Sequence, residues 1–168
     1  MPQRTTFPAS SEGRSLGLRI DTLIRLRWLA VVGQAVSLVV VNDLLGFPLP
    51  LFPCLLAVGL SAVVNLLLRA RFPVARRLGD ISAGPLLAYD VLQLTALLYL
   101  TGGLSNPFAL LYLAPVMISA TALTWTTTAT LGLFATVCAG AVGLWHWPLP
   151  WAGEDVPVLP DLFLAGIW

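Results

Sequence analysis

Long apolar runs, separated by short polar or proline-containing segments, divide almost the whole sequence. A helix needs about 20 predominantly apolar residues to cross the hydrocarbon core of a bilayer. Five runs approach this length, and a sixth begins near the end of the chain; they cover residues 28–45, 51–68, 81–100, 107–123, 129–145 and 159–168. We therefore predict an all-α, polytopic transmembrane helical bundle with five full spans and the start of a sixth, which we expect to continue in a longer protein.

The composition agrees with a membrane location and excludes several functions. The chain is 58% hydrophobic and 10% charged, whereas about 25% of the residues of a soluble domain are charged. It has no basic patch with interleaved aromatic residues, so nucleic acid is not expected as a partner. Cys54 and Cys138 form no C-x-x-C pair and stand near no histidine, so a metal site is not expected.

The arginines predict the orientation of the chain. All nine basic residues are arginines, five before the first run and four between the second and third runs. Basic residues favour the cytoplasmic side, so we place the N-terminus and the second link in the cytoplasm. The links after the first, third and fifth runs are then on the outer side.

The N-terminal region divides into two segments before the first span. Residues 1–15 are polar and are expected to form a flexible cytoplasmic tail. Apolar residues then recur at helical spacing within 16–27, which predicts an amphipathic juxtamembrane helix on the membrane surface. Arg25 and Arg27 are placed at the interface, and residues 28–168 form the transmembrane domain.

The segment Gly102-Gly103-Leu104-Ser105-Asn106-Pro107-Phe108 joins the third and fourth runs. Glycine ends helices well, asparagine caps the start of a helix, and proline suits its first position. These residues therefore predict a tight hairpin. The same glycines permit close approach to the backbone, while Asn106 supplies a polar amide and Phe108 an aromatic face, so a binding site is an equally open interpretation.

A few polar residues and a proline stand out within the apolar runs. Asp90 is an ionisable residue inside the third run, where an unpaired charge is costly. Gln93, Asn65 or an arginine of the second link are its candidate partners. Either a structural bond between helices or a signalling or proton-handling role explains Asp90 and Gln93. Pro115 is expected to bend the fourth span.

Two features lie outside these runs. His146 is the only histidine and, between Trp145 and Trp147, is expected to be an interfacial residue. Residues 125–128, a tryptophan and three threonines, are expected to form a short polar link.

These residues resemble the redox-responsive sensor histidine kinases of the RegB/PrrB/ActS family. Gly-Gly-x-x-Asn-Pro-Phe is similar to the ubiquinone-binding heptapeptide of that family. The likeness extends over most of residues 16–168, and its matching segments are 26–28, 33–36, 90–94, 114–116 and 145–150.

The resemblance implies a bacterial inner-membrane, multi-pass sensory domain. It implies that ubiquinone binds at Gly102, Gly103, Asn106, Pro107 and Phe108 and regulates a histidine kinase. The partners implied are a second copy of the chain, a response regulator and the lipid bilayer. The kinase core with its ATP site is absent from these residues, so no catalytic residue is expected here, and it is expected to lie beyond this chain.

Two alternatives to a quinone sensor remain. A small ion-coupled transporter, or a fragment of one, would use Asp90 and Gln93 near the midplane, although no inverted repeat is visible. A membrane scaffold without a ligand is the residual case. A substrate flux lost in Asp90→Asn would favour the transporter.

Overall fold

In a computed structural model, residues 18–44, 48–72 and 77–147 are described. Helix α1 (Ile20–Val39) continues into a π-helical turn, η1 (Val40–Leu44). The remaining helices are α2 (Leu51–Arg71), α3 (Asp80–Leu100), α4 (Leu113–Ala122) and α5 (Trp125–Leu144). Two 3-10 segments, η2 (Gly103–Ser105) and η3 (Pro107–Tyr112), connect α3 to α4. The predicted all-helical bundle is confirmed for this part of the chain, apart from a ladder of two-residue strands.

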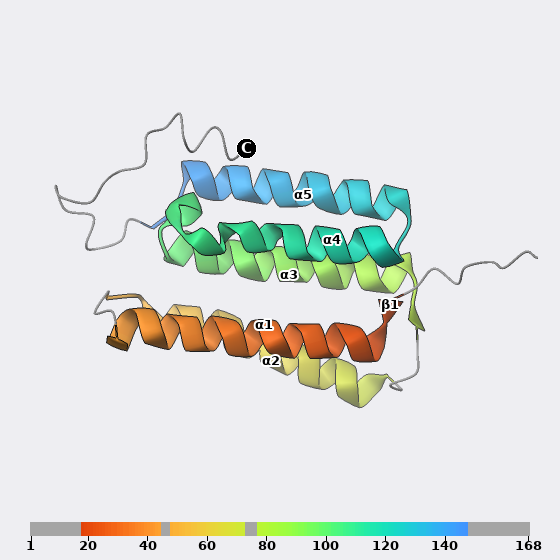
Figure 1. The fold of residues 1–168 in the computed structure, drawn as a ribbon, viewed down its shortest axis with the longest axis horizontal. Coiled ribbons are helices and arrows are strands. Elements are labelled where there is room, and N and C mark those ends of the chain that lie inside the picture. Colours follow the sequence, from red (N-terminus) through yellow and green to blue (C-terminus); the bar gives the residue numbers. More distant parts are fainter. Residues whose placement is uncertain (1–17, 45–47, 73–76, 148–168) are drawn as a thin grey trace, which may run out of the picture.

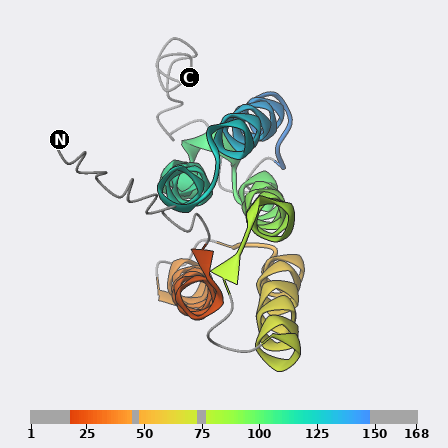
Figure 2. The same ribbon diagram turned by 90° about the vertical axis from the view of Figure 1, so that its right-hand side faces the viewer.

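The helices run side by side along the long axis of the molecule (Figure 1). Seen end-on, α1 and α2 form one group and α4 and α5 another, with α3 between them (Figure 2). Helix α3 packs against α2 on one side and against α4 and α5 on the other. The chain reverses direction at each connection, so the α1–α2 and α3–α4 connections share one end, which we call the loop end. The opposite end holds the α2–α3 and α4–α5 connections.

Two apolar cores follow this division. The larger core joins the first turns of α1 to α3 and α5 and includes Ile20, Leu23, Leu87 and Val91. The smaller core lies between α1 and α2 and includes Val31, Cys54 and Val58, with Leu97 of α3. Because α3 contributes to both cores, a displacement of α3 changes the packing of both groups of helices.

Four helices are long and apolar enough to cross a membrane within the described residues: Ile20–Leu44, Leu51–Arg71, Asp80–Leu100 and Trp125–Leu144. The predicted fourth span, 107–123, is instead a shorter apolar helix, Phe108–Ala122. Its first part is 3-10 helix, which rises about 2.0 Å per residue instead of 1.5 Å. Segments η3 and α4 together therefore extend about 27 Å, close to the thickness of the hydrocarbon core. The sixth run, 159–168, lies outside the described residues.

Pro115 lies in the first turn of α4, directly after the change from 3-10 to α-helix. Segment η3 runs directly into α4, and the Leu113 N–H already bonds to carbonyls of η3. The proline, which has no N–H to donate, therefore lies within a continuous helical segment. Pro115 thus coincides with the change of helix type.

Helix α1 begins at Ile20, directly after a short antiparallel ladder. Strand β1 (Leu18–Arg19) pairs with β2 (Arg77–Leu78), and Leu18 lies opposite Leu78. The ladder joins the segment before α1 to the segment before α3. The apolar side chains of the first turns of α1 are buried in the protein, with Ile20 and Leu23 both 1% exposed.

Helix α5 begins earlier than the expected polar link allows. Trp125 is its first residue, and Thr124 is the N-cap. The Thr124 hydroxyl accepts from the backbone N–H of Thr127 at 3.5 Å. The expectation of a link over residues 125–128 is therefore wrong. Thr124 caps the helix, and residues 125–128 form its first turn.

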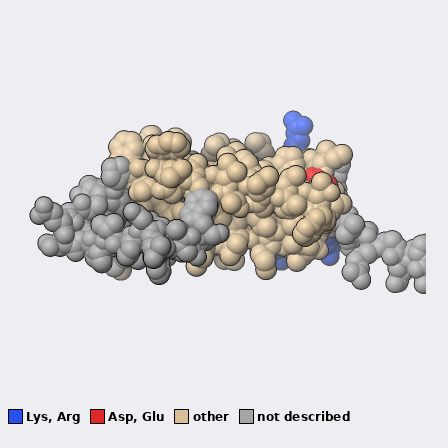
Figure 3. Space-filling view, turned by 90° about the horizontal axis from the view of Figure 1, so that it is seen from above, with Lys and Arg blue, Asp and Glu red and all other residues tan. Residues whose placement is uncertain are grey.

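Charged side chains visible in the space-filling view gather near the end that carries the β1–β2 ladder, while the rest of the described surface in this view is uncharged (Figure 3). Arg69 and Arg71 lie in the last turn of α2, and Asp80 in the first turn of α3. We call this the arginine-rich end. It lies opposite the loop end, so the two ends differ strongly in charge.

Candidate functional site

The glycine loop at the loop end is held in a left-handed backbone conformation. Helix α3 ends at Leu100, and Gly102 and Gly103 follow with φ of 94° and 68°. They are the residues with positive φ within the described ranges. A residue with a Cβ is disfavoured at such φ angles, so the conformation of the turn favours glycine at both positions.

Asn106 fastens the loop at its centre. Its Oδ1 accepts from the backbone N–H of Phe108 at 2.9 Å. Its Nδ2 donates to Thr101 Oγ1 at 2.8 Å and also to the Thr101 carbonyl at 3.3 Å. Pro107 is the first residue of η3. The predicted hairpin, with a glycine stop and an Asn-Pro start, is therefore confirmed.

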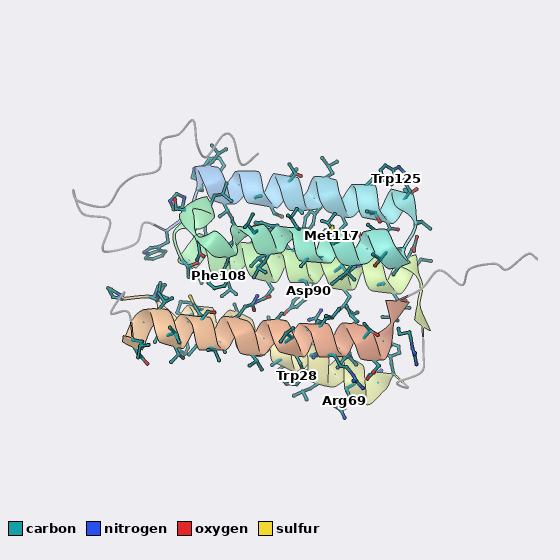
Figure 4. All side chains as sticks on the ribbon, in the orientation of Figure 1. Trp28, Arg69, Asp90, Phe108, Met117 and Trp125 are labelled. Atoms are coloured by element: carbon teal, nitrogen blue, oxygen red, sulfur yellow. The ribbon has the colours of Figure 1, made fainter. Side chains whose placement is uncertain are left out.

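Phe108 is exposed at the edge of the loop. Its side chain is 40% exposed, and it lies at the loop end of the helix that continues to Met117 (Figure 4). Leu110, Leu113 and Met117 continue along the same segment and are more exposed than Phe108. An aromatic ring thus stands at the start of an apolar surface that extends along η3 and α4.

The segment after α5 lies against the loop. The backbone N–H of Trp147 donates to the Tyr99 carbonyl at 2.8 Å, which joins this segment to the last turn of α3. A Cβ on Gly103 would stand 2.7 Å from Cγ of His146, so the imidazole ring lies directly on this glycine. His146 Nδ1 is 3.2 Å from the Val142 carbonyl. The only histidine is therefore a neighbour of the loop.

A polar cluster crosses the interior between the two ends. Asp90 of α3 and Arg27 of α1 form an ion pair, with 2.8 Å between Oδ1 and Nη1. Arg27 is 4% exposed. Its Nη2 donates to Ser61 of α2 at 3.4 Å, and its guanidinium lies 5.3 Å from the centre of the Tyr89 ring. Figure 4 shows Asp90 on the side of α3 that faces α1.

The partner of Asp90 thus differs from those expected. Arg27 was placed at the membrane interface and is instead inside the bundle, because it shares the buried face of α1 with Ile20, Ile24 and Val31. Gln93 does not bond to Asp90; its Nε2 donates to Gln34 of α1 at 2.9 Å.

Asn65 was the other expected partner of Asp90. Its Nδ2 donates to the Ile24 carbonyl at 3.0 Å. Each of these polar residues therefore connects two different helices, and none of the described contacts joins the cluster to the glycine loop.

A second polar cluster lies at the arginine-rich end. The Asp80 carboxylate accepts hydrogen bonds from the hydroxyls of Thr124 and Thr127, the latter at 2.9 Å. It joins the start of α3 to the start of α5. A hollow of about 330 Å³ lies beside it, bounded by Gly84, Pro85, Phe134 and further residues of α3 and α5.

Neither the glycine loop nor Asp90 lines this hollow. Its walls belong to the opposite end of the bundle from Gly102–Phe108. In the part of the chain that the structure describes, no group of three or more His, Cys, Asp or Glu side chains could hold a metal ion.

The contacts of four residues at the glycine loop and in the two polar clusters were not predicted: those of Arg27, Thr101, Asp80 and His146. For Arg27 a signal was present, because positions 20, 24, 27 and 31 follow one helical stripe. For Asp80, the signal was indirect: Thr124, which bonds to Asp80, is a residue type that commonly caps the start of a helix. The contacts of Thr101 and His146 leave no comparable signal, since they depend on how the loop folds.

Comparison of the sequence with known proteins identifies relatives in one family. Over 150 residues, 89% of this chain, it is 45% identical to a sensor histidine kinase RegB of Cereibacter sphaeroides. A second RegB sequence, from a strain of the same species, is 45% identical over 78 residues, 46% of this chain. The matched residues cover 32% of the length of the first relative and 17% of the length of the second. The chain thus spans about a third of the first relative.

No protein-family profile matches the chain, and no solved structure matches it. The family assignment therefore rests on the two curated relatives, together with the helical architecture. The likeness to the first relative covers nearly all of the described bundle, including the polar cluster and the glycine loop. The chain belongs to the RegB family, and it is a membrane domain of a RegB-family sensor kinase.

Proposed function

We propose that this chain is the sensory membrane domain of a histidine kinase, that it lies in a bacterial inner membrane, and that it binds ubiquinone at the glycine loop. The bound quinone regulates a kinase core beyond this chain, which phosphorylates a partner response regulator. The chain acts as a homodimer. The family assignment supports the kinase, and the geometry of the loop supports the ligand site.

The observation that carries the ligand site is the exposed Phe108 on a loop that Asn106 holds rigid. A quinone headgroup is a flat ring that can stack on an aromatic side chain, which is worth about 0.5–1.5 kcal/mol beyond burial. Its isoprenoid tail requires an apolar surface, and Leu110, Leu113 and Met117 provide one beginning next to Phe108. A ligand at this edge therefore has a place for both of its parts.

Among the described residues, the contacts of Asp90 favour a structural role over an ion-coupled site. Asp90 is paired with Arg27, so its charge is compensated inside the bundle. A transporter site at Asp90 and Gln93 would need a path for an ion, and the hollow at the arginine-rich end is not lined by either residue. We propose that this cluster holds α1, α2 and α3 in register.

A binding measurement tests the proposal. The chain in lipid nanodiscs is titrated with a ubiquinone that carries a short isoprenoid tail. Phe108→Ala is expected to weaken binding about 10-fold, since about 1.4 kcal/mol corresponds to a factor of ten.

The matched control is Phe52→Ala. Phe52 is another exposed aromatic residue, 81% exposed, in the first turn of α2 at the same end of the bundle. Its loss is expected to leave binding unchanged. Equal effects of the two substitutions would mean that the ligand partitions into lipid instead of binding at the loop.

A further inference from the structure

The side-chain amide of Asn106 is engaged within the loop. Its Nδ2 donates to Thr101, at 2.8 Å to Oγ1 and 3.3 Å to the carbonyl, and its Oδ1 accepts from the backbone N–H of Phe108 at 2.9 Å. A quinone oxygen bound by this amide would compete with the bonds that hold the loop. Asn106 is therefore a positioning residue of the loop, and we look to a second polar group to hold the ring oxygen of the ligand.

We propose that His146 is this group, and that its Nε2 forms the hydrogen bond to a ring oxygen of the quinone headgroup. This inference rests on the proposed function of the loop. His146 is exposed, follows α5 and lies on Gly103, which is one of the motif glycines. It thus brings a polar ring nitrogen to the loop from a different part of the chain.

The position of the ring is determined by two anchors. The Trp147 N–H bond to the Tyr99 carbonyl fixes the backbone next to His146. The contact of His146 Nδ1 with the Val142 carbonyl fixes the rotation of the ring. A ring held at both points loses little further conformational entropy when it binds a ligand.

The second anchor also determines what Nε2 can do. A carbonyl only accepts hydrogen bonds, so the nitrogen that faces Val142 carries a hydrogen. In the neutral ring Nε2 is then an acceptor, which suits the hydroxyl of ubiquinol. In the charged ring Nε2 is a donor, which suits the carbonyl of ubiquinone. The two redox forms thus differ in what they require of Nε2, since the hydroxyl needs an acceptor and the carbonyl needs a donor.

Gly103 is also required because its lack of a side chain leaves space for the His146 ring. A Cβ at Gly103 would stand 2.7 Å from Cγ and 2.8 Å from Nδ1 of His146. Any larger residue would displace the ring from the loop. Gly103 is thus required for the position of His146 as well as for the turn.

The first test compares two replacements of His146 in the nanodisc titration, with both ubiquinone and ubiquinol. His146→Leu removes the ring nitrogens and is expected to weaken binding about 10-fold, as expected for a lost hydrogen bond of about 1.4 kcal/mol. His146→Gln retains a donor and an acceptor and is expected to stay within about three-fold of the parent. Trp145→Leu, an exposed neighbour, is the control without effect.

The outcomes separate this inference from the proposed function. If the parent chain binds neither redox form, the proposed function fails. If the parent binds and His146→Leu binds equally well, only the role of His146 fails. If His146→Gln weakens quinone binding as much as His146→Leu does, the ring supports the loop by packing and not by a hydrogen bond to the ligand. The inference is then also overturned.

A measurement on the unaltered chain covers the case in which the variants do not fold. His146 is the only histidine, so both imidazole signals in a ¹⁵N spectrum belong to it, and their couplings to the ring protons distinguish Nε2 from Nδ1. Addition of ubiquinone or ubiquinol is expected to shift the Nε2 signal by more than the Nδ1 signal. An Nε2 signal that stays unchanged at saturating ligand would overturn the inference.

Discussion

Nη1 of Arg27 lies 2.8 Å from Oδ1 of Asp90, and this ion pair joins α1 to α3 inside the helical bundle. Arg27 also reaches Ser61, so a single guanidinium contacts residues of two other helices. Removing one partner of a buried ion pair leaves the other charge without compensation, whereas removing both can be nearly neutral. The pair is therefore most informative when its members are changed singly and together.

We expect Arg27→Met and Asp90→Leu each to lower the free energy of unfolding by about 3 kcal/mol. The double variant is expected to lie within about 1 kcal/mol of the parent, because no unpaired charge remains. Unfolding in mixed detergent micelles measures all four proteins of this cycle. Additive effects of the two single changes would show that the pair is not coupled.

The two motif glycines are expected to differ in their sensitivity to alanine. Gly102→Ala places a Cβ at φ of 94°, which costs about 1–2 kcal/mol. Gly103→Ala has a similar backbone cost and also meets the His146 ring, so we expect a larger loss. Thermal unfolding of the chain in detergent measures both.

Gly59→Ala in α2 is the matched control for these glycines, since nothing lies within 4 Å of the added Cβ. Alanine is favoured over glycine inside a helix, so this variant is expected to gain up to about 1 kcal/mol. A Gly103→Ala protein as stable as the parent would contradict the close contact with His146.

The Asp80–Thr124 contact is expected to protect the start of α5. In Thr124→Ala the helix loses both its N-cap and a hydroxyl partner of the Asp80 carboxylate. Amide hydrogen exchange at residues 126–128 is therefore expected to become faster. Thr136→Ala serves as the control, because its hydroxyl bonds to Gly132 within the same helix. Unchanged exchange in Thr124→Ala would mean that packing alone holds this end.

The orientation predicted from the arginines can be measured with single cysteines in a background that lacks Cys54 and Cys138. Ser105→Cys in the glycine loop is expected to react with a membrane-impermeant maleimide added from the periplasmic side. Arg71→Cys is expected to react only from the cytoplasmic side, because basic residues favour that side. Both positions are exposed. The reverse labelling pattern would invert the topology.

Features that depend on neighbours in the sequence could be predicted without the structure. The apolar runs indicated the helices, and four of them are long enough to span a membrane. Gly102 after α3, with Asn106 and Pro107 before the next helix, indicated the hairpin, because helix stops and starts are chosen by residues within one turn. The fourth run was less reliable, since its 3-10 start depends on local geometry that hydropathy does not reveal.

Contacts between distant residues could not be predicted in the same way. Asp90 was expected to need a partner inside the bundle, and its partner, Arg27, is 63 residues away in the sequence. Which side of α1 faces α3 depends on the packing of Ile20, Leu23 and Val91 in the core. The side-chain amide of Asn106 and the ring of His146 are likewise placed by the folded loop.

The sequence alone thus establishes a helical membrane bundle with a glycine-stopped, Asn-Pro-started hairpin at one end. Hydrophobicity, backbone angles and caps act over a few residues and can be seen in the order of the chain. Only the tertiary structure decides that Arg27 compensates Asp90, that Asn106 is occupied by Thr101 and that His146 lies on Gly103. The reason is that such pairings depend on how helices rotate and pack against one another, which many weak contacts determine together.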